Sequence, residues 1–197
     1  PEIEWGDNAG LSDALRLLEP VKEKHGDALS WADLIVLAGT AAIEEAGGRS
    51  MRFCGGRVDV EDGSSSKGLE FKFPPSNIGA ARLKDNIRLL GVTLREFTAL
   101  TGGGHALGKM HEERSGFKGQ WTPDPRHLSN AYFQVLLRED WEEFEVPAAP
   151  AGGPGGTEEA KEPILQFKAK GKDLFMLPAD LLFRTDAELA AICEEYA

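Results

Sequence analysis

Two shortages set the first limits on this sequence. Cys54 and Cys193 are its only cysteines among 197 residues, and they belong to no C-x-x-C pair. This argues against a disulfide framework and against a thiolate zinc site. No apolar run approaches the roughly 18–20 residues that a membrane-spanning helix needs, and no signal or transit pattern is visible. The chain begins with Pro1 instead of Met, so we expect that an N-terminal part was removed, cleaved or left out.

Basic residues are also scarce. The chain has 22 basic against 33 acidic residues and a net charge of −11. No stripe of Lys and Arg offers a face for phosphates, which argues against nucleic acid as a partner. An acidic surface suits a basic protein partner, although such a surface commonly serves only to keep a protein dissolved.

Three familiar glycine and histidine motifs are missing as well. The glycines at 102–104 form neither G-x-G-x-x-G nor a P-loop, which argues against phosphate binding. His105 and His111 lie six residues apart, whereas a zinc protease site needs a spacing of four. On spacing alone, His105 is better explained as a structural histidine. Three adjacent glycines do allow the backbone to approach a flat or bulky partner closely.

Apolar periodicity predicts a mainly helical protein. Residues 8–25 have leucines and an alanine on one face, and Pro20 is expected to kink or end the first part of this helix. A second helix starts after Ser30, with Asp33 three residues on and Gly47-Gly48 as its stop. Its apolar residues lie nearly all round the helix, which predicts a central, buried position.

The middle of the chain alternates between irregular and helical stretches. Residues 48–79 are rich in Gly, Ser and Pro and predict a long connection, and residues 80–90 predict a helix. Thr93 and Glu96 form a capping box for the next helix. We expect the glycines at 102–104 to end that helix, so that His105 begins a new segment.

The last third predicts a small sheet between helices. Residues 126–138 read as a helix, and a β-hairpin is expected near residues 163–177, turning about Gly171. Residues 147–162 predict a flexible Pro/Gly-rich loop insertion. Thr185 is the expected cap of the final helix. We find no internal repeat and expect one domain over residues 1–197.

Several separated motifs resemble class I haem peroxidases, the family of ascorbate peroxidase, cytochrome c peroxidase and catalase-peroxidase. The motifs occur in the family's order, and the match as a whole extends over almost all of the chain. The motifs are LSWADLIVLAGTAAIEEAGG (29–48), CGGRVD (54–59), GGHALGKMH (103–111), RSGFKGQW (114–121), LPAD (177–180) and EYA (195–197). The resemblance implies a haem-peroxidase-like helical domain.

The resemblance also implies a haem b site. His105 matches the histidine that binds the haem iron, and Asp180 matches the carboxylate that accepts a hydrogen bond from its other ring nitrogen. Such a bond fixes the tautomer and makes the imidazole more basic, which favours cleavage of the O–O bond. Trp121 matches the indole beneath the histidine. Trp121 and Asp180 are therefore the implied catalytic residues.

Two further residues match the edge of that site. His111 matches a residue near a haem propionate, where a protonatable donor suits a carboxylate. Arg114 matches the arginine that helps to hold ascorbate at the exposed haem edge. A surface arginine that follows two glutamates is an equally good explanation of Arg114.

The sequence departs from the family in the region of its cation loop. Ala106 and Ser129 stand where ascorbate peroxidases usually have a hydroxyl and a carboxylate, while Thr122 and Asp124 are retained. The segment FKFPPSNIG (71–79) replaces the family's Gly-Arg-Leu-Pro-Asp.

The largest departure is the missing distal signature Arg-x-x-Trp-His, which does not occur in the sequence. We therefore expect the chain to be the proximal half of the fold, without the N-terminal distal helices. A missing distal segment or other protein subunits would then cover the opened face.

Three functions remain open at this point. The first is a peroxidase that reduces hydrogen peroxide with a small reductant such as ascorbate, or with a cytochrome c-type donor. The alternative is a catalytically inactive accessory subunit of a larger photosynthetic or respiratory complex, without haem. The third hypothesis is a non-catalytic haem carrier, which no particular sequence feature favours. The resemblance favours a chloroplast or a mitochondrion as the location.

Overall fold

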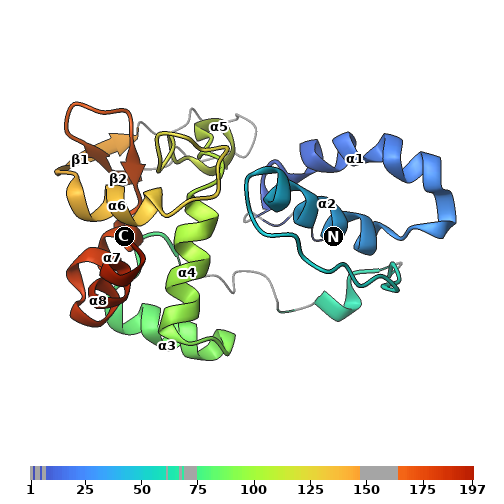
Figure 1. The fold of residues 1–197 in the computed structure, drawn as a ribbon, viewed down its shortest axis with the longest axis horizontal. Helices are drawn as coiled ribbons and strands as arrows, with labels where there is room; N and C mark the ends of the chain where they lie inside the picture. Colours follow the sequence, from blue (N-terminus) through green and yellow to red (C-terminus); the bar gives the residue numbers. More distant parts are fainter. Residues whose placement is uncertain are drawn as a thin grey trace. The chain divides into compact units, whose positions relative to one another are not determined.

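A computed structural model describes residues 2, 5, 8–60, 62–66, 68, 75–146 and 164–197. The chain divides into two compact units, Pro1–Lys72 and Phe73–Ala197, which are drawn in Figure 1. The fold class is confirmed, because the described residues are mainly helical with one small antiparallel sheet. The loop predicted at 147–162 lies outside the described residues. None of the helices in the described ranges combines the length and the apolar character needed to cross a bilayer.

The first unit is built on two helices, α1 (Leu11–His25) and α2 (Trp31–Glu45). Short 3-10 turns lie at Gly26–Ala28 and Ser64–Ser66. Pro20 does not end α1, which continues to His25. A proline removes one helical hydrogen bond and leaves one carbonyl without its donor. No residue of α1 is buried, so water can satisfy that carbonyl.

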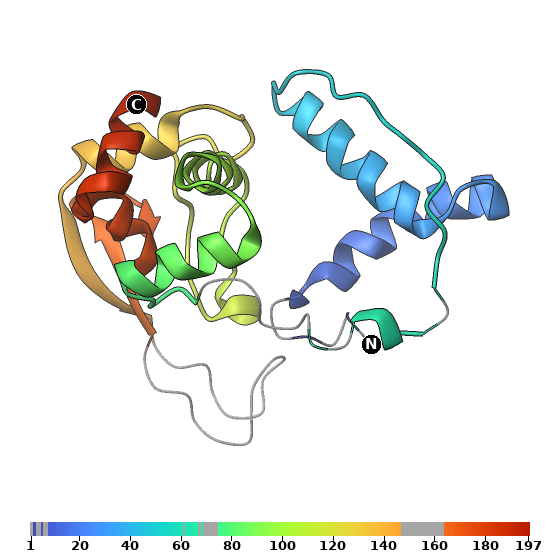
Figure 2. The ribbon, with the colours of Figure 1, turned by 90° about the horizontal axis from the view of Figure 1, so that it is seen from below.

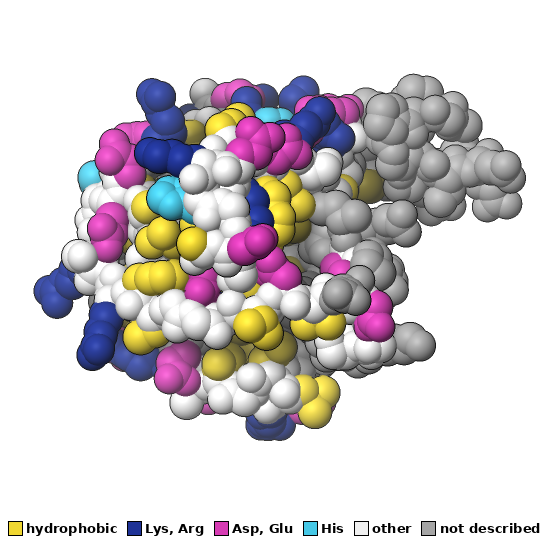
Figure 3. Space-filling model, turned by 90° about the vertical axis from the view of Figure 1, so that its right-hand side faces the viewer, with side chains coloured by type: hydrophobic (Ala, Val, Ile, Leu, Met, Phe, Trp, Pro, Cys, Tyr) yellow, Lys and Arg dark blue, Asp and Glu magenta, His cyan; other side chains and the backbone are white. Residues whose placement is uncertain are grey.

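The prediction of a central buried α2 is wrong. Ser30 caps the helix as expected, accepting a hydrogen bond from the Asp33 amide at 3.1 Å. Only Asp33 and Leu34 are buried, however, and Ile35 remains 48% exposed. Within its unit α2 has α1 and the extended segment 51–60 as neighbours, and these leave much of its apolar surface open. Groups of exposed apolar side chains are visible on the face drawn in Figure 3.

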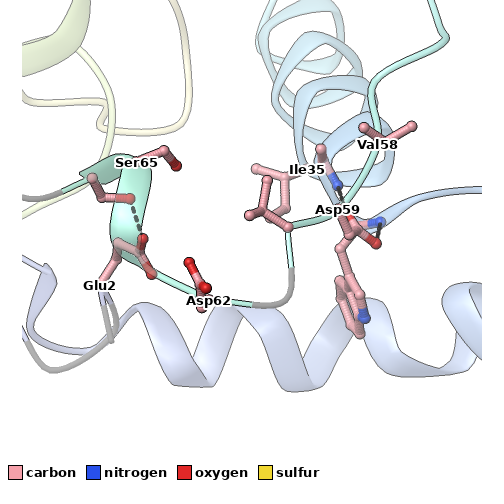
Figure 4. Close-up of a pocket in the computed structure, with 10 residues that line it drawn as sticks. Glu2, Ile35, Val58, Asp59, Asp62 and Ser65 are labelled. Carbon is pink, nitrogen blue, oxygen red and sulfur yellow. Dashed lines mark hydrogen bonds between the residues drawn. The ribbon is translucent and has the colours of Figure 1, made fainter.

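Two carboxylates tie α2 to the segment that follows it. Asp33 accepts hydrogen bonds from the Gly56 amide at 2.7 Å and from the Arg57 guanidinium at 2.9 Å. Asp59 accepts from the first amides of the helix, Trp31 at 2.8 Å and Ala32 at 2.9 Å. Figure 4 shows Asp59 near Ile35 and Val58, with which it lines an open cavity of about 440 Å³.

Acid is expected to release this segment from α2. The Gly56 amide and the Arg57 guanidinium lower the pKa of Asp33, and the amides of Trp31 and Ala32 lower that of Asp59. A lowered pKa means that the stabilisation is present above the unfolded value of about 3.9 and is lost as the pH falls through the lower folded value. The protection of the Trp31 and Gly56 amides against hydrogen exchange should therefore fall as the pH drops below about 4. Unchanged protection across that range, or the same acid profile in Asp59→Asn as in the unaltered chain, would contradict the expectation.

The second unit contains the remaining helices and the sheet (Figure 1). Its core includes Leu83, Ile87, Tyr132, Leu136, Met176, Phe183 and Leu189. Its helices are α3 (Ala80–Leu90), α4 (Leu94–His105), α5 (Glu112–Ser115), α6 (Ala131–Arg138), α7 (Pro178–Thr185) and α8 (Ala187–Tyr196). Figure 2 looks along α4, with α3 and the C-terminal helices around it.

Helix α4 starts as predicted and ends later than predicted. The Thr93–Glu96 capping box is present, and α3 spans the predicted residues. The helix does not end at the glycines; it runs through them to His105, and Ala106 is its C-cap. Gly102 faces α6, where a Cβ atom would lie 2.1 Å from the ring of Phe133. One of the three glycines thus allows close packing, and it does so inside a continuous helix.

The sheet has three antiparallel strands in the order β1 (Trp141–Val146), β2 (Ile164–Ala169) and β3 (Phe175–Met176). The predicted hairpin is confirmed as β2 and β3, which connect through Gly171 at φ 71°. Strand β1 was not predicted. Its sequence WEEFEV has three glutamates, which are depleted in strands, and its pairing partner β2 lies far along the chain.

Three boundaries differ from the predictions. Helix α6 starts at Ala131 instead of residue 126. Helix α7 was not predicted, and Thr185 is its last residue. Asp186 caps α8 in place of Thr185, accepting hydrogen bonds from the Glu188 and Leu189 amides. A carboxylate is as good a cap as a hydroxyl, so the local sequence left both residues possible.

Both cysteines are free, Cys54 exposed and Cys193 buried. Burial raises the pKa of Cys193 to about 12. A thiol of that kind is an inert part of the core.

Candidate functional site

His105 is the last residue of α4, so its backbone is fixed by the helix that precedes it. The following residue, Ala106, is fully buried, and its carbonyl accepts a hydrogen bond from the Thr122 hydroxyl at 3.2 Å. The helix end and the strand-like segment that carries Trp121 are therefore held together. The His105 side chain retains 27% exposure.

Asp180 lies in the first turn of α7 and is 1% exposed. Its Oδ2 accepts a hydrogen bond from the Leu177 amide at 2.8 Å, so the carboxylate caps its own helix. Pro178 occupies the first helical turn, where it costs no hydrogen bond. The sequence LPAD thus folds into a helix start that points a buried carboxylate inwards.

Three side chains donate to this carboxylate. His105 Nδ1 lies 2.9 Å from Asp180 Oδ1, and the Tyr132 hydroxyl donates to the same oxygen at 2.7 Å. The Trp121 indole N–H donates to Asp180 Oδ2 at 2.9 Å. The structure therefore brings together His105, Trp121 and Asp180, as the resemblance implied. Helices α4, α6 and α7, which carry His105, Tyr132 and Asp180, lie next to one another (Figures 1 and 2).

The hydrogen bonds keep Asp180 ionised despite its burial. Burial by itself would raise the pKa of this carboxyl group. The neighbouring His105 and the hydrogen bonds from His105, the Leu177 amide and Tyr132 outweigh that effect and lower the pKa of Asp180. Burial, together with the adjacent Asp180 carboxylate, raises the pKa of Tyr132 well above its ordinary value. Tyr132 is thus a neutral donor to a buried anion.

Aromatic contacts fix the plane of the histidine ring. Trp121 stacks on His105 with ring centroids 4.1 Å apart and an interplanar angle of 15°. Tyr132 meets the histidine edge-on, at 5.6 Å and 67°. Because Nδ1 is held by Asp180, the opposite nitrogen Nε2 is the one left for a ligand. A histidine oriented by a carboxylate is a common arrangement for a metal ligand.

An apolar cavity of about 650 Å³ opens beside His105. Its size lies within the roughly 300–1,000 Å³ of small-molecule and cofactor sites. Gly104 contributes bare backbone to the wall, because a Cβ atom there would meet nothing within 4 Å. The apolar lining comes mainly from α3, α4 and α7 and includes Leu83, Leu90, Phe97, Leu100, Leu177 and Phe183.

The other two predicted site residues lie apart from this cavity. His111 occupies the N-cap position of the short helix α5 without a side-chain cap hydrogen bond; it is exposed, with Nδ1 3.5 Å from a Glu113 oxygen. Arg114 lies in α5 and is also exposed. Neither residue lines the cavity beside His105. Their roles at the edge of a haem remain predictions.

Thr122 and Asp124, the two residues retained from the cation loop, make local hydrogen bonds. The Thr122 hydroxyl donates a hydrogen bond to the Ala106 carbonyl, and Asp124 accepts a hydrogen bond from the Arg126 amide at 3.2 Å. Within the described ranges, no three His, Cys, Asp or Glu side chains converge on a point where a metal ion could bind.

Tyr132 is the functional candidate that sequence reasoning missed. It lies on the buried face of α6, where apolar periodicity identifies it only as a core aromatic. Its hydroxyl group was the available signal, since a buried Tyr hydroxyl needs a hydrogen-bond partner. The partner Asp180 is 48 residues away, so the local sequence could not name it.

A family model of peroxidases matches residues 1–197 of this chain. A protein of Pyricularia oryzae, whose name describes a heme-binding peroxidase, is 38% identical over 197 residues, which cover 99% of this chain and 62% of that protein. A protein of Oryza sativa subsp. japonica, named as a peroxisomal L-ascorbate peroxidase, is 42% identical over 135 residues, 68% of this chain and 44% of that protein. A protein of Yarrowia lipolytica, named as a mitochondrial cytochrome c peroxidase, is 33% identical over 190 residues, 96% of this chain and 61% of that protein. The chain thus spans between 44% and 62% of the length of these relatives.

Proposed function

This chain belongs to the peroxidase family, and on that premise we propose that its second unit is the haem-binding side of an enzyme that reduces hydrogen peroxide. The observation that carries the proposal is the buried Asp180 carboxylate, which accepts from His105 at 2.9 Å and from Trp121 at 2.9 Å beside an apolar cavity. The names of the relatives describe peroxidases. They give no support to the accessory-subunit alternative.

The residues present fit a haem b group. The cavity is apolar and has the volume of a cofactor site, and its wall includes both His105 and the side-chain-free backbone of Gly104. The imidazole is orientated through Nδ1, so Nε2 would be the nitrogen that holds the iron. Bound haem would supply the iron at which peroxide is reduced and through which electrons return from a donor.

The residues of this chain then have separate tasks. Asp180 fixes the tautomer of His105 and increases its electron donation. Trp121 holds the imidazole plane by stacking and shares the same carboxylate. Tyr132 donates to Asp180 Oδ1 and so competes with His105 for that oxygen. His111 is proposed to donate to a propionate, and Arg114 to bind a small anionic reductant such as ascorbate.

Cleavage of the O–O bond also needs groups on the opposite face of the haem. A general base must take a proton from peroxide and return it to the leaving oxygen, and a cation must stabilise the developing negative charge. The motif that supplies both in the family does not occur in residues 1–197. We therefore propose that a segment outside these residues, or another subunit, supplies them. The relatives named as peroxisomal and mitochondrial favour an organelle as the location.

Haem binding through His105 is the decisive test. Titration of the purified chain with haem is expected to give a Soret band at about one haem per chain, and His105→Ala is expected to abolish it, because the ligand nitrogen that Asp180 orientates is removed. His127→Ala is a matched control, since His127 is exposed and lies outside the cavity. Circular dichroism should show that all three proteins keep their helices.

Two outcomes of that titration would overturn the assignment. A Soret band that is unshifted and undiminished in His105→Ala would show that another residue binds the iron. No haem uptake by the unaltered, folded chain would show that the cavity beside His105 is not a haem site.

A further inference from the structure

Residues Met110–Gly119 form a closed loop, which we call the site loop. Its two ends pair through backbone hydrogen bonds, from the Met110 amide to the Gly119 carbonyl at 2.7 Å and from the Gly119 amide to the Met110 carbonyl at 3.2 Å. Helix α5 stands between these ends and carries Arg114, with His111 just before it. The site loop therefore presents both residues that the proposed function places at the haem edge.

One fully buried side chain of the sheet binds this loop. Gln166 of β2 is 0% exposed, and the hydrogen bonds of its side chain go to the loop and not to Asp180. Its Oε1 accepts a hydrogen bond from the Lys118 amide at 2.8 Å, and its Nε2 donates to the Lys118 carbonyl at 3.3 Å. Nε2 also lies 3.5 Å from the Met110 sulfur. The side-chain amide thus pairs with Lys118 as a neighbouring strand would, and it touches both ends of the loop.

The loop backbone lies directly on the sheet around this contact. A Cβ atom on Gly116 would lie 2.7 Å from Ile164 Cδ1, and one on Gly119 would lie 2.1 Å from the Phe175 ring. Both glycines have positive φ angles, 76° and 87°. The Phe175 amide also donates to the Gln120 carbonyl at 2.9 Å, just beyond the loop. Apolar contacts therefore set the height of the loop above the sheet, and Gln166 supplies a directional polar contact between them.

We propose that Gln166 is a positioning residue, which holds the site loop so that Arg114 is presented to the reductant. The proposal rests on the proposed function for the roles of His111 and Arg114. Its physical basis is that the Lys118 amide and carbonyl both use the Gln166 side chain on the side that faces the sheet, where the loss of a hydrogen-bond partner is costly. Without Gln166 the loop must move towards water to satisfy them. Because Gln166 is separate from the Asp180 hydrogen bonds, its loss should leave His105 undisturbed.

Two variants test the contact itself, and neither needs haem. Gln166→Met keeps a similar volume and removes the amide, and Gln166→Asn keeps the amide and shortens its reach. In both, hydrogen exchange at the Lys118 amide is expected to accelerate at least tenfold, while exchange in α4 stays unchanged. Gln134→Met is the matched control. It removes a hydrogen bond of 2.9 Å to the Ala197 carbonyl, which involves neither the sheet nor the loop, and Lys118 should exchange at its normal rate.

Steady-state kinetics of the full-length, haem-loaded protein test the consequence. With ascorbate as the probe, the KM of Gln166→Met is expected to rise at least threefold, with kcat within twofold. With guaiacol, a neutral phenol that needs no arginine, KM should stay within twofold, and the Soret band should not move.

The outcomes separate this inference from the function on which it rests. Unchanged exchange at Lys118 in both Gln166 variants would overturn the positioning role, whatever the kinetics show. Equal changes in KM for ascorbate and guaiacol would also overturn it, because they indicate general damage. If the chain binds no haem, the proposed function fails, and exchange at Lys118 still decides whether Gln166 holds the loop.

Discussion

Asp180→Ala is expected to lower the free energy of unfolding by about 3–5 kcal/mol, the range for removing one partner of a buried charged pair. The reason is that the hydrogen-bond donors around Asp180 would lose their acceptor. The Trp121 N–H, the Tyr132 hydroxyl, the Leu177 amide and His105 Nδ1 all use this carboxylate. Alanine leaves these groups without an acceptor inside the core, where each unpaired donor is costly. Urea unfolding, followed by tryptophan fluorescence and by circular dichroism, measures the loss.

A graded set of variants identifies the cause. Asp180→Asn keeps the shape of the side chain but replaces one carboxylate oxygen with an NH2 group. This group cannot accept the N–H or O–H hydrogen bonds that the oxygen accepted, so most of the loss of stability should remain. Asp186→Ala is the matched control, because Asp186 caps α8 and pairs with Lys84 at 2.8 Å near the surface. Loss of such a cap costs about 1 kcal/mol. If Asp180→Ala costs no more than Asp186→Ala, the network around the buried carboxylate contributes little, and the account of the site is wrong.

Local signals in the sequence were sufficient for the starts of α2 and α4. Ser30 with Asp33, and Thr93 with Glu96, are caps whose partners lie three residues away, so short-range chemistry determines them. The end of α4 was not predictable in the same way. Glycine usually stops helices, but here the packing of Phe133 against Gly102 outweighs that tendency. Strand β1 was missed for a related reason, because its pairing with β2 depends on contacts far along the chain.

The residues of the candidate site also differ in whether the sequence could identify them. His105, Trp121 and Asp180 were named from a resemblance between motifs, and the sequence separation of 75 between His105 and Asp180 excludes a local derivation. Tyr132, the buried partner of Asp180, and the positioning residue Gln166 belong to no recognisable sequence motif. In the sequence alone, Tyr132 is one more core aromatic and Gln166 one more glutamine in a strand. Only the fold brings the Asp180 carboxylate within hydrogen-bond distance of Tyr132, and the loop residue Lys118 within hydrogen-bond distance of Gln166. Residues that hold a site together are therefore harder to predict than residues that belong to its signature.

The three glycines at the end of α4 allow a prediction in which two physical effects oppose each other. Gly102→Ala should gain about 1 kcal/mol from helix propensity. The new methyl group would lie 2.1 Å from the Phe133 ring, however, and overpacking of this kind costs about 1–3 kcal/mol or more. Phe133 is itself held between Tyr132 and Tyr196, so it has little room to move. We therefore expect a net loss of stability, measured by urea or thermal unfolding.

The neighbouring glycines are matched controls in the same helical turn. A Cβ atom on Gly103 would lie 3.9 Å from Leu128, an ordinary contact, and one on Gly104 would meet nothing within 4 Å. Alanine at either position should leave stability unchanged or raise it by up to about 1 kcal/mol. If all three variants were stabilised alike, helix propensity would govern this turn and the close packing of α4 on α6 would not matter. If Gly102→Ala alone is destabilised, the bare backbone at that position serves to bring α6, and with it Tyr132, within reach of Asp180.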